Sequence, residues 1–135
     1  MIIGFKNQFE QPILDGTKIH SMREDLHNRY REGVNLQMAT GVRTKKYHQF
    51  AQNPCTGTQK IKIQYKSTGS VNVFIDGVLF YYQDSRGFVS EEKSKKNMLL
   101  LAKNDGFDSI GSFFAWFNKD FSGKIIHWTP FRYKP

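Results

Sequence analysis

Alternation of hydrophobic and polar positions predicts strands in the middle of the chain. Val34, Leu36 and Met38 alternate with polar residues, which is the pattern of a half-buried strand. Residues 60–65 repeat this pattern, with isoleucine and tyrosine on one face and lysine on the other. The sequence therefore predicts strands that each turn one face toward a core.

A turn signal places two more strands. Residues 71–75 and 78–82 are apolar runs on either side of Asp76-Gly77. This dipeptide favours a two-residue hairpin, because both central residues of that turn take positive φ. We also expect a short opening strand at Ile2, Ile3 and Phe5, and a closing strand over residues 124–133.

Apolar residues three or four positions apart predict the helices. Phe5, Phe9 and Ile13 form one stripe of a short helix that stops at Gly16. A second helix is predicted over residues 94–104. Asp108 is the expected N-cap of a third helix. The core-facing stripe of that third helix consists of Ile110, Phe113, Phe114 and Phe117.

Two stretches carry no regular period. Residues 18–23 are predicted to be extended chain or turn. Residues 41–59 hold two Gly, one Pro and several Thr and Gln, and are predicted to form a long loop, which in a compact domain is usually functional or mobile.

The whole pattern predicts one α+β domain over residues 1–135, in which a small, partly closed barrel hides the sheet edges.

Composition and charge narrow the class of protein. The 135 residues are 39% hydrophobic and 15% aromatic, which is enough for a packed core. The formal net charge is +8, and no Asp or Glu occurs between Gly33 and Ile75. The last fifteen residues also lack acids. If these segments meet in space, they form a positive surface, whose natural partners are polyanions and above all nucleic acid.

Other classes of protein are not indicated. Cys55 is the only cysteine, so the chain has no internal disulfide. The sequence has neither a signal-peptide pattern nor an apolar run of membrane-spanning length, so we expect a cytoplasmic protein that does not bind membranes. No phosphate-binding glycine motif or metal-ligand spacing occurs. We therefore expect no metal and no cofactor.

The segment from Gly16 to Arg23 is the strongest candidate for chemistry. Lys18, Ser21 and Arg23 follow at intervals of two or three residues after a helix-ending glycine. A desolvated lysine can lose its proton and activate a hydroxyl, and an arginine can clamp a phosphate or a carboxylate. The alternative is a solvated Lys18, a turn serine and a surface ion pair from Arg23 to a nearby acid.

This segment resembles the hallmark of the ASCH (activating-signal-cointegrator homology) domain, a family of the PUA-like superfamily. The family pattern is G-x-K-x-x-[T/S]-x-R after the first helix. It appears here as Gly16, Lys18, Ser21 and Arg23. The likeness continues in Asp105-Gly106-Phe107 and in the closing apolar strand that follows Gly123.

The resemblance implies a PUA-like mixed β-barrel of about five to six strands with two to three flanking helices. It also implies an association with RNA. One branch of the family, the small bacterial acetylcytidine amidohydrolases, uses a Lys, a Thr and a Glu. By position these correspond to Lys18, Ser21 and Asp105. Serine keeps the hydroxyl of threonine, whereas aspartate shortens the reach of glutamate by one methylene.

The leading hypothesis is a module that binds RNA or a nucleotide-like ligand in a basic cleft around Lys18, Ser21 and Arg23. Basic and aromatic residues interleaved in the 41–59 loop fit phosphate contact and base stacking. These loop residues are Arg43, Lys45, Lys46, Tyr47 and His48. Among the remaining aromatics, one or two of Tyr81, Tyr82, Trp116, Trp128 and Tyr133 are expected to face a ligand.

Two alternatives remain open. The first is an enzyme, either a nuclease or an amidohydrolase of acylated nucleosides such as acetylcytidine. In the amidohydrolase Lys18 is the base, Ser21 the nucleophile and Asp105 a proton carrier or orienting group. The second is a protein-interaction module with a vestigial cleft. Proximity of Asp105 to Lys18 and Ser21 favours the enzyme.

Overall fold

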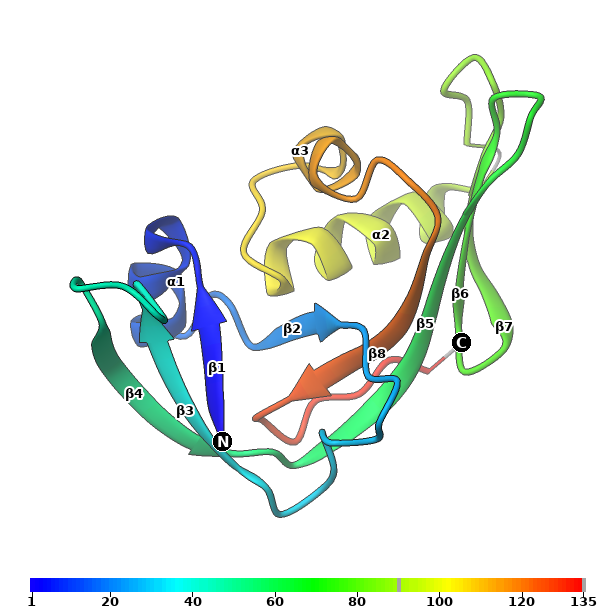
Figure 1. Ribbon diagram of the computed structural model, residues 1–135. Helices are drawn as coiled ribbons and strands as arrows, with labels where there is room; N and C mark the ends of the chain where they lie inside the picture. The colour runs from blue at the N-terminus through cyan, green and yellow to red at the C-terminus, as the bar shows by residue number, and fades with distance from the viewer. Residues whose placement is uncertain (90, 135) are drawn as a thin grey trace.

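The computed structural model describes residues 1–89 and 91–134, and within them eight strands and three helices form an α+β fold (Figure 1). This fold class was predicted from the sequence. The strands are β1 (Ile2–Phe5), β2 (His20–Arg23), β3 (Asn35–Thr40), β4 (His48–Pro54), β5 (Gly57–Tyr65), β6 (Val71–Ile75), β7 (Val78–Gln83) and β8 (Phe121–His127). The helices are α1 (Glu10–Leu14), α2 (Glu92–Asn104) and α3 (Ile110–Trp116), with a 3₁₀ turn η1 (Asn7–Phe9) before α1.

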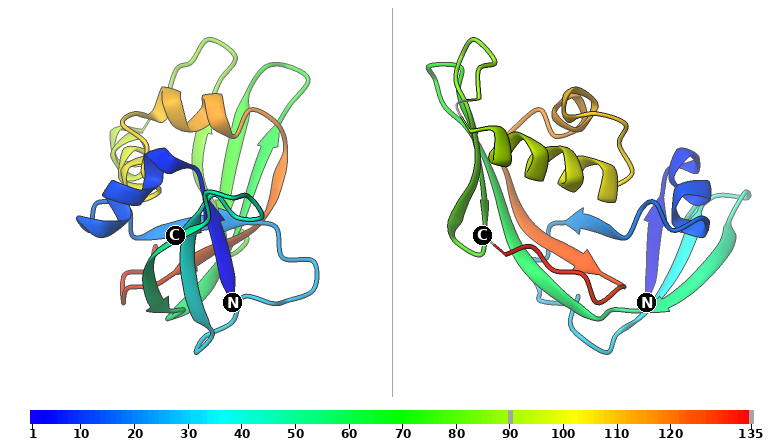
Figure 2. Two further views of the ribbon diagram at one scale, coloured as in Figure 1. Left: turned by 60° about the vertical axis from the view of Figure 1, so that its left-hand side comes forward. Right: turned by 180° about the vertical axis from the view of Figure 1, so that it is seen from behind.

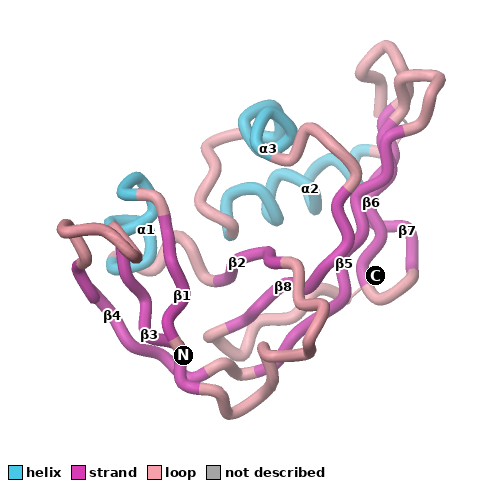
Figure 3. The backbone as a smooth tube through the Cα atoms, viewed as in Figure 1, coloured by secondary structure: helices cyan, strands magenta, loops and turns pink. Residues whose placement is uncertain are grey.

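The strands form two sheets (Figure 3). The smaller sheet has the order β1-β3-β4, with β1 parallel to β3 and β3 antiparallel to β4. The larger sheet has the order β2-β8-β5-β6-β7 and is antiparallel throughout. Strand β1 is therefore an edge of one sheet, and β2 is an edge of the other.

The two sheets are joined where β4 continues into β5. Cys55 and Thr56 link the two strands, and their backbone amides donate to Val34 O (2.7 Å) and His127 O (2.9 Å). The chain thus passes from one sheet to the other without losing its backbone hydrogen bonds. No ladder connects β1 to β2, so the residues that the structure describes do not form a closed barrel, and the two sheets diverge from the β4–β5 junction (Figure 2).

Helices α2 and α3 cover one face of the larger sheet (Figures 1 and 2). The predicted stripe of α3 is confirmed, because Phe113 is fully buried and the other three stripe residues pack against the core. Phe113 lies edge-to-face with Phe107 and Phe114, which is a favoured aromatic geometry. None of the helices in the described residues is both long and apolar enough to cross a membrane.

Several predicted elements are confirmed. Alternation over residues 60–65 is observed in β5, where Ile61 and Ile63 are buried and the lysines are exposed. Asp76 and Gly77 connect β6 to β7 with φ values of 51° and 81°. The short helix near the N-terminus is also present, as η1 followed by α1, although Phe5 of its predicted stripe belongs to β1.

Four predictions need correction. Residues 41–59 are not one long loop, because β4 and the start of β5 lie within them, and only residues 41–47 and the link of Cys55 and Thr56 lie outside strands. Strand β8 ends at His127 rather than Tyr133. Ser109, not Asp108, caps α3, since its hydroxyl accepts from Ser112 N at 3.0 Å. The described strands number eight rather than five or six.

Candidate functional site

A cleft of about 640 Å³ opens at the seam between the unpaired strands β1 and β2. Its walls come from β1, β2, the 41–47 loop, η1 and the segment from Asp105 to Phe117. The side chains that line it include Lys6, Phe9, Lys18, Ser21, Arg23, Asp105 and Trp116. The cleft therefore brings Lys18, Ser21, Arg23 and Asp105 together, although Asp105 is 87 positions from Lys18 in the sequence.

Lys18 is buried although it carries an amino group. Only 2% of the residue is exposed, and the side chain passes over the ring of Phe9, with Nζ 4.8 Å from the ring centroid. Nζ donates to Asp105 O at 2.6 Å and to His20 O at 2.9 Å, and it lies 3.4 Å from Asp105 Oδ1. Three acceptors thus surround the three N–H groups of an ammonium.

Burial and charge act in opposite directions on this lysine. Burial lowers the pKa of Lys18, since desolvation penalises the charged form, and the carboxylate of Asp105 offsets part of this effect. The two backbone carbonyls also stabilise the ammonium. This arrangement suits a fixed cation that holds its surroundings in place.

Gly106 makes room for the Lys18 side chain. Its φ of +94° lies in the region that favours glycine, and a Cβ at this position would lie 3.0 Å from Lys18 Cδ and 2.9 Å from Phe9 Cδ1. The backbone after α2 can therefore approach the lysine closely enough for Asp105 O to accept its hydrogen bond.

Asp105 also holds His20. Its Oδ1 atom lies 3.0 Å from His20 Nδ1, while His20 Nε2 lies 2.6 Å from the hydroxyl of Tyr133. A carboxylate only accepts, so Nδ1 carries the proton and Nε2 accepts from Tyr133. Asn104 Nδ2 donates to the Tyr133 hydroxyl at 3.1 Å, which completes the chain.

This network fixes one oxygen of Asp105 and leaves the other available. Burial lowers the pKa of His20, with a partial offset from Asp105, so the imidazole is neutral and the carboxylate balances Lys18. No described residue donates a hydrogen bond to Asp105 Oδ2, and Asp105 lines the cleft. Asp105 is only 3% exposed, so it is a rigidly held carboxylate at the base of the cleft, and its second oxygen has no donor among the described residues.

Ser21 and Arg23 form a second group on β2. Ser21 Oγ accepts from Arg23 Nε at 3.2 Å, and Lys18 Nζ is not among its partners in the described chain. A terminal nitrogen of Arg23 donates to Gly4 O at 2.7 Å, and its guanidinium carbon lies 4.9 Å from the Phe5 ring centroid. Arg23 therefore bridges the open seam from β2 to β1.

Aromatic rings form the other wall. Trp116 lies edge-to-face with Phe9, with ring centroids 5.5 Å apart, and is 5.7 Å from Phe107. Trp116 is 46% exposed, although it belongs to the cleft lining. Among the other candidate aromatics, Tyr81 and Tyr133 are buried in the core, and Tyr82 and Trp128 are not part of the cleft lining, so Trp116 is the candidate that faces the cleft.

The predicted basic loop is at the rim. Gly41, Val42 and Thr44 line the cleft, and the intervening and following residues are exposed. The exposed set consists of Arg43, Lys45, Lys46, Tyr47 and His48. His48 already belongs to β4, and its Nε2 lies 3.7 Å from a carboxylate oxygen of Glu10.

His20 and Tyr133 were missed as parts of the site. The sequence patterns predict no role for His20, and they predict Tyr133 only as one of five aromatics of which one or two face a ligand. In the described residues no group of three or more His, Cys, Asp or Glu side chains is placed to hold a metal ion. The position of His20 inside the Gly16–Arg23 segment was an available signal, whereas nothing near Tyr133 indicated its contact with a residue 113 positions away.

Comparison with known proteins adds no relative, because no family model, curated protein or solved structure matches this chain.

Proposed function

We propose that this chain is a cytoplasmic RNA-binding module of the ASCH type, whose cleft takes one nucleotide unit. In this proposal the two sheets are the halves of a PUA-like barrel that is open between β1 and β2. The continuity of β4 with β5 and the Arg23 side chain across the seam support such a barrel. The hallmark residues lie where the ligand enters.

The chemistry of the cleft lining carries the proposal. One wall is aromatic and ends in the exposed ring of Trp116, on which a base can stack. The other wall presents Arg23, and Lys6 lies at the same opening. The carboxylate of Asp105 offers an acceptor for an N–H group of a base. A stacking ring, cations and one acceptor together suit a nucleotide better than a purely apolar ligand.

The 41–47 loop extends this positive surface. Arg43, Lys45 and Lys46 are exposed, and the same loop lines the cleft. These residues are placed to contact phosphates on either side of the bound nucleotide, so binding should weaken steeply as salt rises. Tyr47 offers a second stacking surface beside them.

Trp116→Ala is the direct test of the nucleotide site. Loss of one stacking contact should raise the Kd for cytidine monophosphate about 5- to 150-fold, because stacking contributes about 1–3 kcal/mol per base. Isothermal titration calorimetry with the intact protein measures this change. Phe88→Ala is the matched control, since Phe88 is exposed and is not part of the cleft lining. Equal affinity of wild type and Trp116→Ala would exclude stacking, and absence of binding to the wild type would overturn the proposal.

Hydrolysis of an acylated nucleoside is the second candidate function. It is favoured by one observation, the contact between Lys18 Nζ and Asp105 in the cleft that also contains Ser21. In this reaction Ser21 Oγ attacks the amide carbonyl, Lys18 takes the hydroxyl proton, and the amine leaves with a proton from the site. Water then releases the acyl group as a carboxylic acid. Lys18 is an ammonium in this site, so it must first release a proton to solvent and leave a carbonyl partner before it can accept the proton of Ser21. This requirement ranks hydrolysis below binding.

Incubation with acetylcytidine decides between the two candidates. If the chain is an amidohydrolase, wild type releases cytidine, and Lys18→Ala and Ser21→Ala each reduce the rate by about 100- to 10,000-fold. Chromatography measures the product, and circular dichroism checks that the variants are folded. Ser21→Ala removes one oxygen that accepts from Arg23 Nε, so a loss of activity is attributed to the missing hydroxyl when the variant keeps the circular dichroism spectrum of the wild type. No cytidine release by the wild type excludes this candidate.

A further inference from the structure

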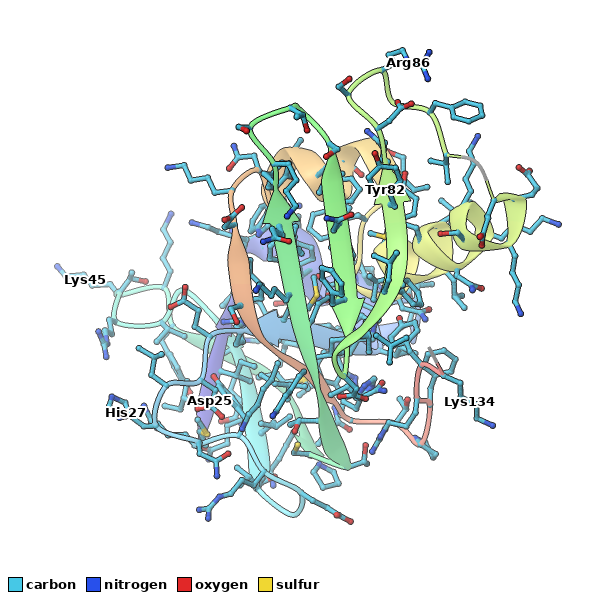
Figure 4. All side chains as sticks on the ribbon, turned by 90° about the vertical axis from the view of Figure 1, so that its right-hand side faces the viewer. Asp25, His27, Lys45, Tyr82, Arg86 and Lys134 are labelled. Atoms are coloured by element: carbon cyan, nitrogen blue, oxygen red, sulfur yellow. The ribbon has the colours of Figure 1, made fainter. Side chains whose placement is uncertain are left out.

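A second concave surface lies on the outer face of the larger sheet. It is a groove of about 580 Å³ between β5, β6, β8 and the segment that follows β2. Figure 4 looks onto this sheet, with Asp25 and His27 beside it. Lys60 and Lys62 line the groove together with Phe74, and Leu26, which is 88% exposed, stands at its edge. The groove shares no lining residue with the cleft.

The strand register connects this groove to the cleft. Arg23 in β2 is paired with Lys124 in β8, and Lys124 is paired with Lys60 in β5. Directly opposed residues of antiparallel strands have their side chains on the same face. A row of three cations therefore crosses three adjacent strands, starting at the cleft residue Arg23 and ending in the groove. Adjacent strands lie about 4.8 Å apart, so the row is continuous.

Such a row of cations lowers the stability of the folded protein when no anion is bound to it. Like charges directly opposite each other on a sheet destabilise it. Only the middle member is compensated, because Lys124 Nζ donates to Asp25 Oδ2 at 2.8 Å. Asp25 is also the only carboxylate in the groove lining, and it accepts from the backbone amides of Arg29 and Tyr30. Asp76 Oδ1 accepts from the backbone amide of Lys60 at 2.9 Å, but among the described residues no carboxylate forms an ion pair with Nζ of Lys60 or of Lys62. Both side-chain ammonium groups therefore remain free for an anion.

Apolar side chains lie beside these lysines. Lys62 is paired with Phe74, and Phe74 with Leu79, on the same outer face. In the next row Asn72 is paired with Tyr82, which is 44% exposed. Lysines next to aromatic rings on an open sheet face form the combination that contacts the backbone and the bases of a single strand. A protein partner would have to supply carboxylates for the lysines and flat groups for the rings separately, whereas an RNA strand supplies phosphates and bases together.

We infer that this outer sheet face is a second contact surface for single-stranded RNA, and that it binds the continuation of the strand whose nucleotide occupies the cleft. The inference rests on the proposed function. Phosphates leave the cleft at Arg23, pass the row of cations, and reach Lys60 and Lys62. Phe74 and Tyr82 lie beside this path for the bases. Affinity should therefore grow with RNA length beyond the unit held by the cleft.

Length-dependent binding tests the inference. A fluorescein-labelled dinucleotide and a labelled RNA of about ten nucleotides are titrated with the intact protein, and anisotropy is read over a salt series. We expect the longer RNA to bind wild type more tightly. In Lys60→Glu/Lys62→Glu this gain in affinity should be lost, whereas the affinity for the dinucleotide should be unchanged. The slope of log K against log salt concentration for the longer RNA should become shallower by about 1.4, which is about 0.7 for each lost phosphate contact.

Lys95→Glu/Lys96→Glu is the matched control. It makes the same change of net charge on the exposed side of α2 and should leave the length gain intact. If both double variants lower the affinity equally, the effect is one of net charge and the inference is wrong. If the wild type binds the dinucleotide and the longer RNA with the same affinity, the inference fails and the proposed function stands. If neither RNA binds, the proposed function fails as well.

Discussion

Asp105→Ala is expected to lower the free energy of unfolding by about 3–5 kcal/mol. The substitution leaves the ammonium of Lys18 in a site where the residue is only 2% exposed, and it removes the acceptor of His20 Nδ1. Removal of one partner from a buried ion pair is costly, because the remaining charge can reach neither water nor a counter-ion. Urea unfolding followed by tryptophan fluorescence measures the change.

Two further variants make this result interpretable. Asp108→Ala lies three positions away in an exposed site and should change stability by no more than about 0.5 kcal/mol. Asp105→Asn keeps an acceptor for His20 but removes the charge, so its loss should be intermediate. If Asp105→Ala were as stable as Asp108→Ala, Lys18 and Asp105 would not form an ion pair in the folded protein, and the charge assignment of the site would be wrong.

The residues of the network link the stability of the fold to the shape of the cleft. Lys18 donates to backbone carbonyls on β2 and after α2, and His20 connects Asp105 to Tyr133 near the end of the described chain. Three segments that are far apart in the sequence thus meet at one buried carboxylate. A site built in this way holds Asp105 rigidly, which is what discrimination among bases by a single acceptor requires.

Local patterns were sufficient to predict most of the larger sheet. Strands β5, β6 and β7 follow one another through short turns, so their alternation and the Asp76-Gly77 turn are visible within a window of about twenty residues. Strand β4 was missed for the opposite reason. Its residues from His48 to Pro54 are polar except for Phe50, Ala51 and the terminal proline, and none of them is fully buried, so no alternation is visible. Pairing with β3 rather than intrinsic preference makes them a strand.

The candidate site was predictable only in part. The spacing of Lys18, Ser21 and Arg23 placed all three in one segment, and the structure places all three in the cleft. The contacts of that segment were not predictable, because they depend on tertiary structure. The expected pair of Lys18 and Ser21 is replaced by Lys18 with Asp105 and Ser21 with Arg23. Lys18 meets Asp105 because the chain after α2 approaches it closely at Gly106, and sequence periodicity cannot reveal such an approach.

Two buried histidines are expected to make the protein lose stability as pH falls. Burial, with smaller contributions from His20 and Arg132, lowers the pKa of His127 to about 3. His127 Nε2 lies 3.1 Å from Gln59 Oε1, which accepts its proton, and Nδ1 has no partner in the described structure. A second proton on Nδ1 would therefore be buried without an acceptor. Burial lowers the pKa of His20 in the same direction.

The direction of this pH dependence of stability follows from proton uptake on unfolding. Below the ordinary histidine pKa of about 6.5 the unfolded chain binds protons that the folded protein does not, so unfolding becomes more favourable as pH decreases. The contribution of each neutral buried histidine to the free energy of unfolding is fully present above about pH 6.5. It is lost progressively as pH falls toward the lowered pKa of the folded state, at up to about 1.4 kcal/mol per pH unit for each histidine. Urea unfolding at a series of pH values measures the slope.

His127→Gln separates this effect from the titration of carboxylates, which also weakens proteins in acid. Glutamine can still donate to Gln59 but does not titrate, so the slope below about pH 6.5 should decrease by up to about 1.4 kcal/mol per pH unit. His27→Gln replaces an exposed histidine and should leave the slope unchanged. If both variants keep the wild-type slope, His127 takes up its proton in the folded state, and the buried unpaired Nδ1 must have an acceptor. That outcome would place a bound water or a rearranged Gln59 beside His127, next to the network that holds Asp105.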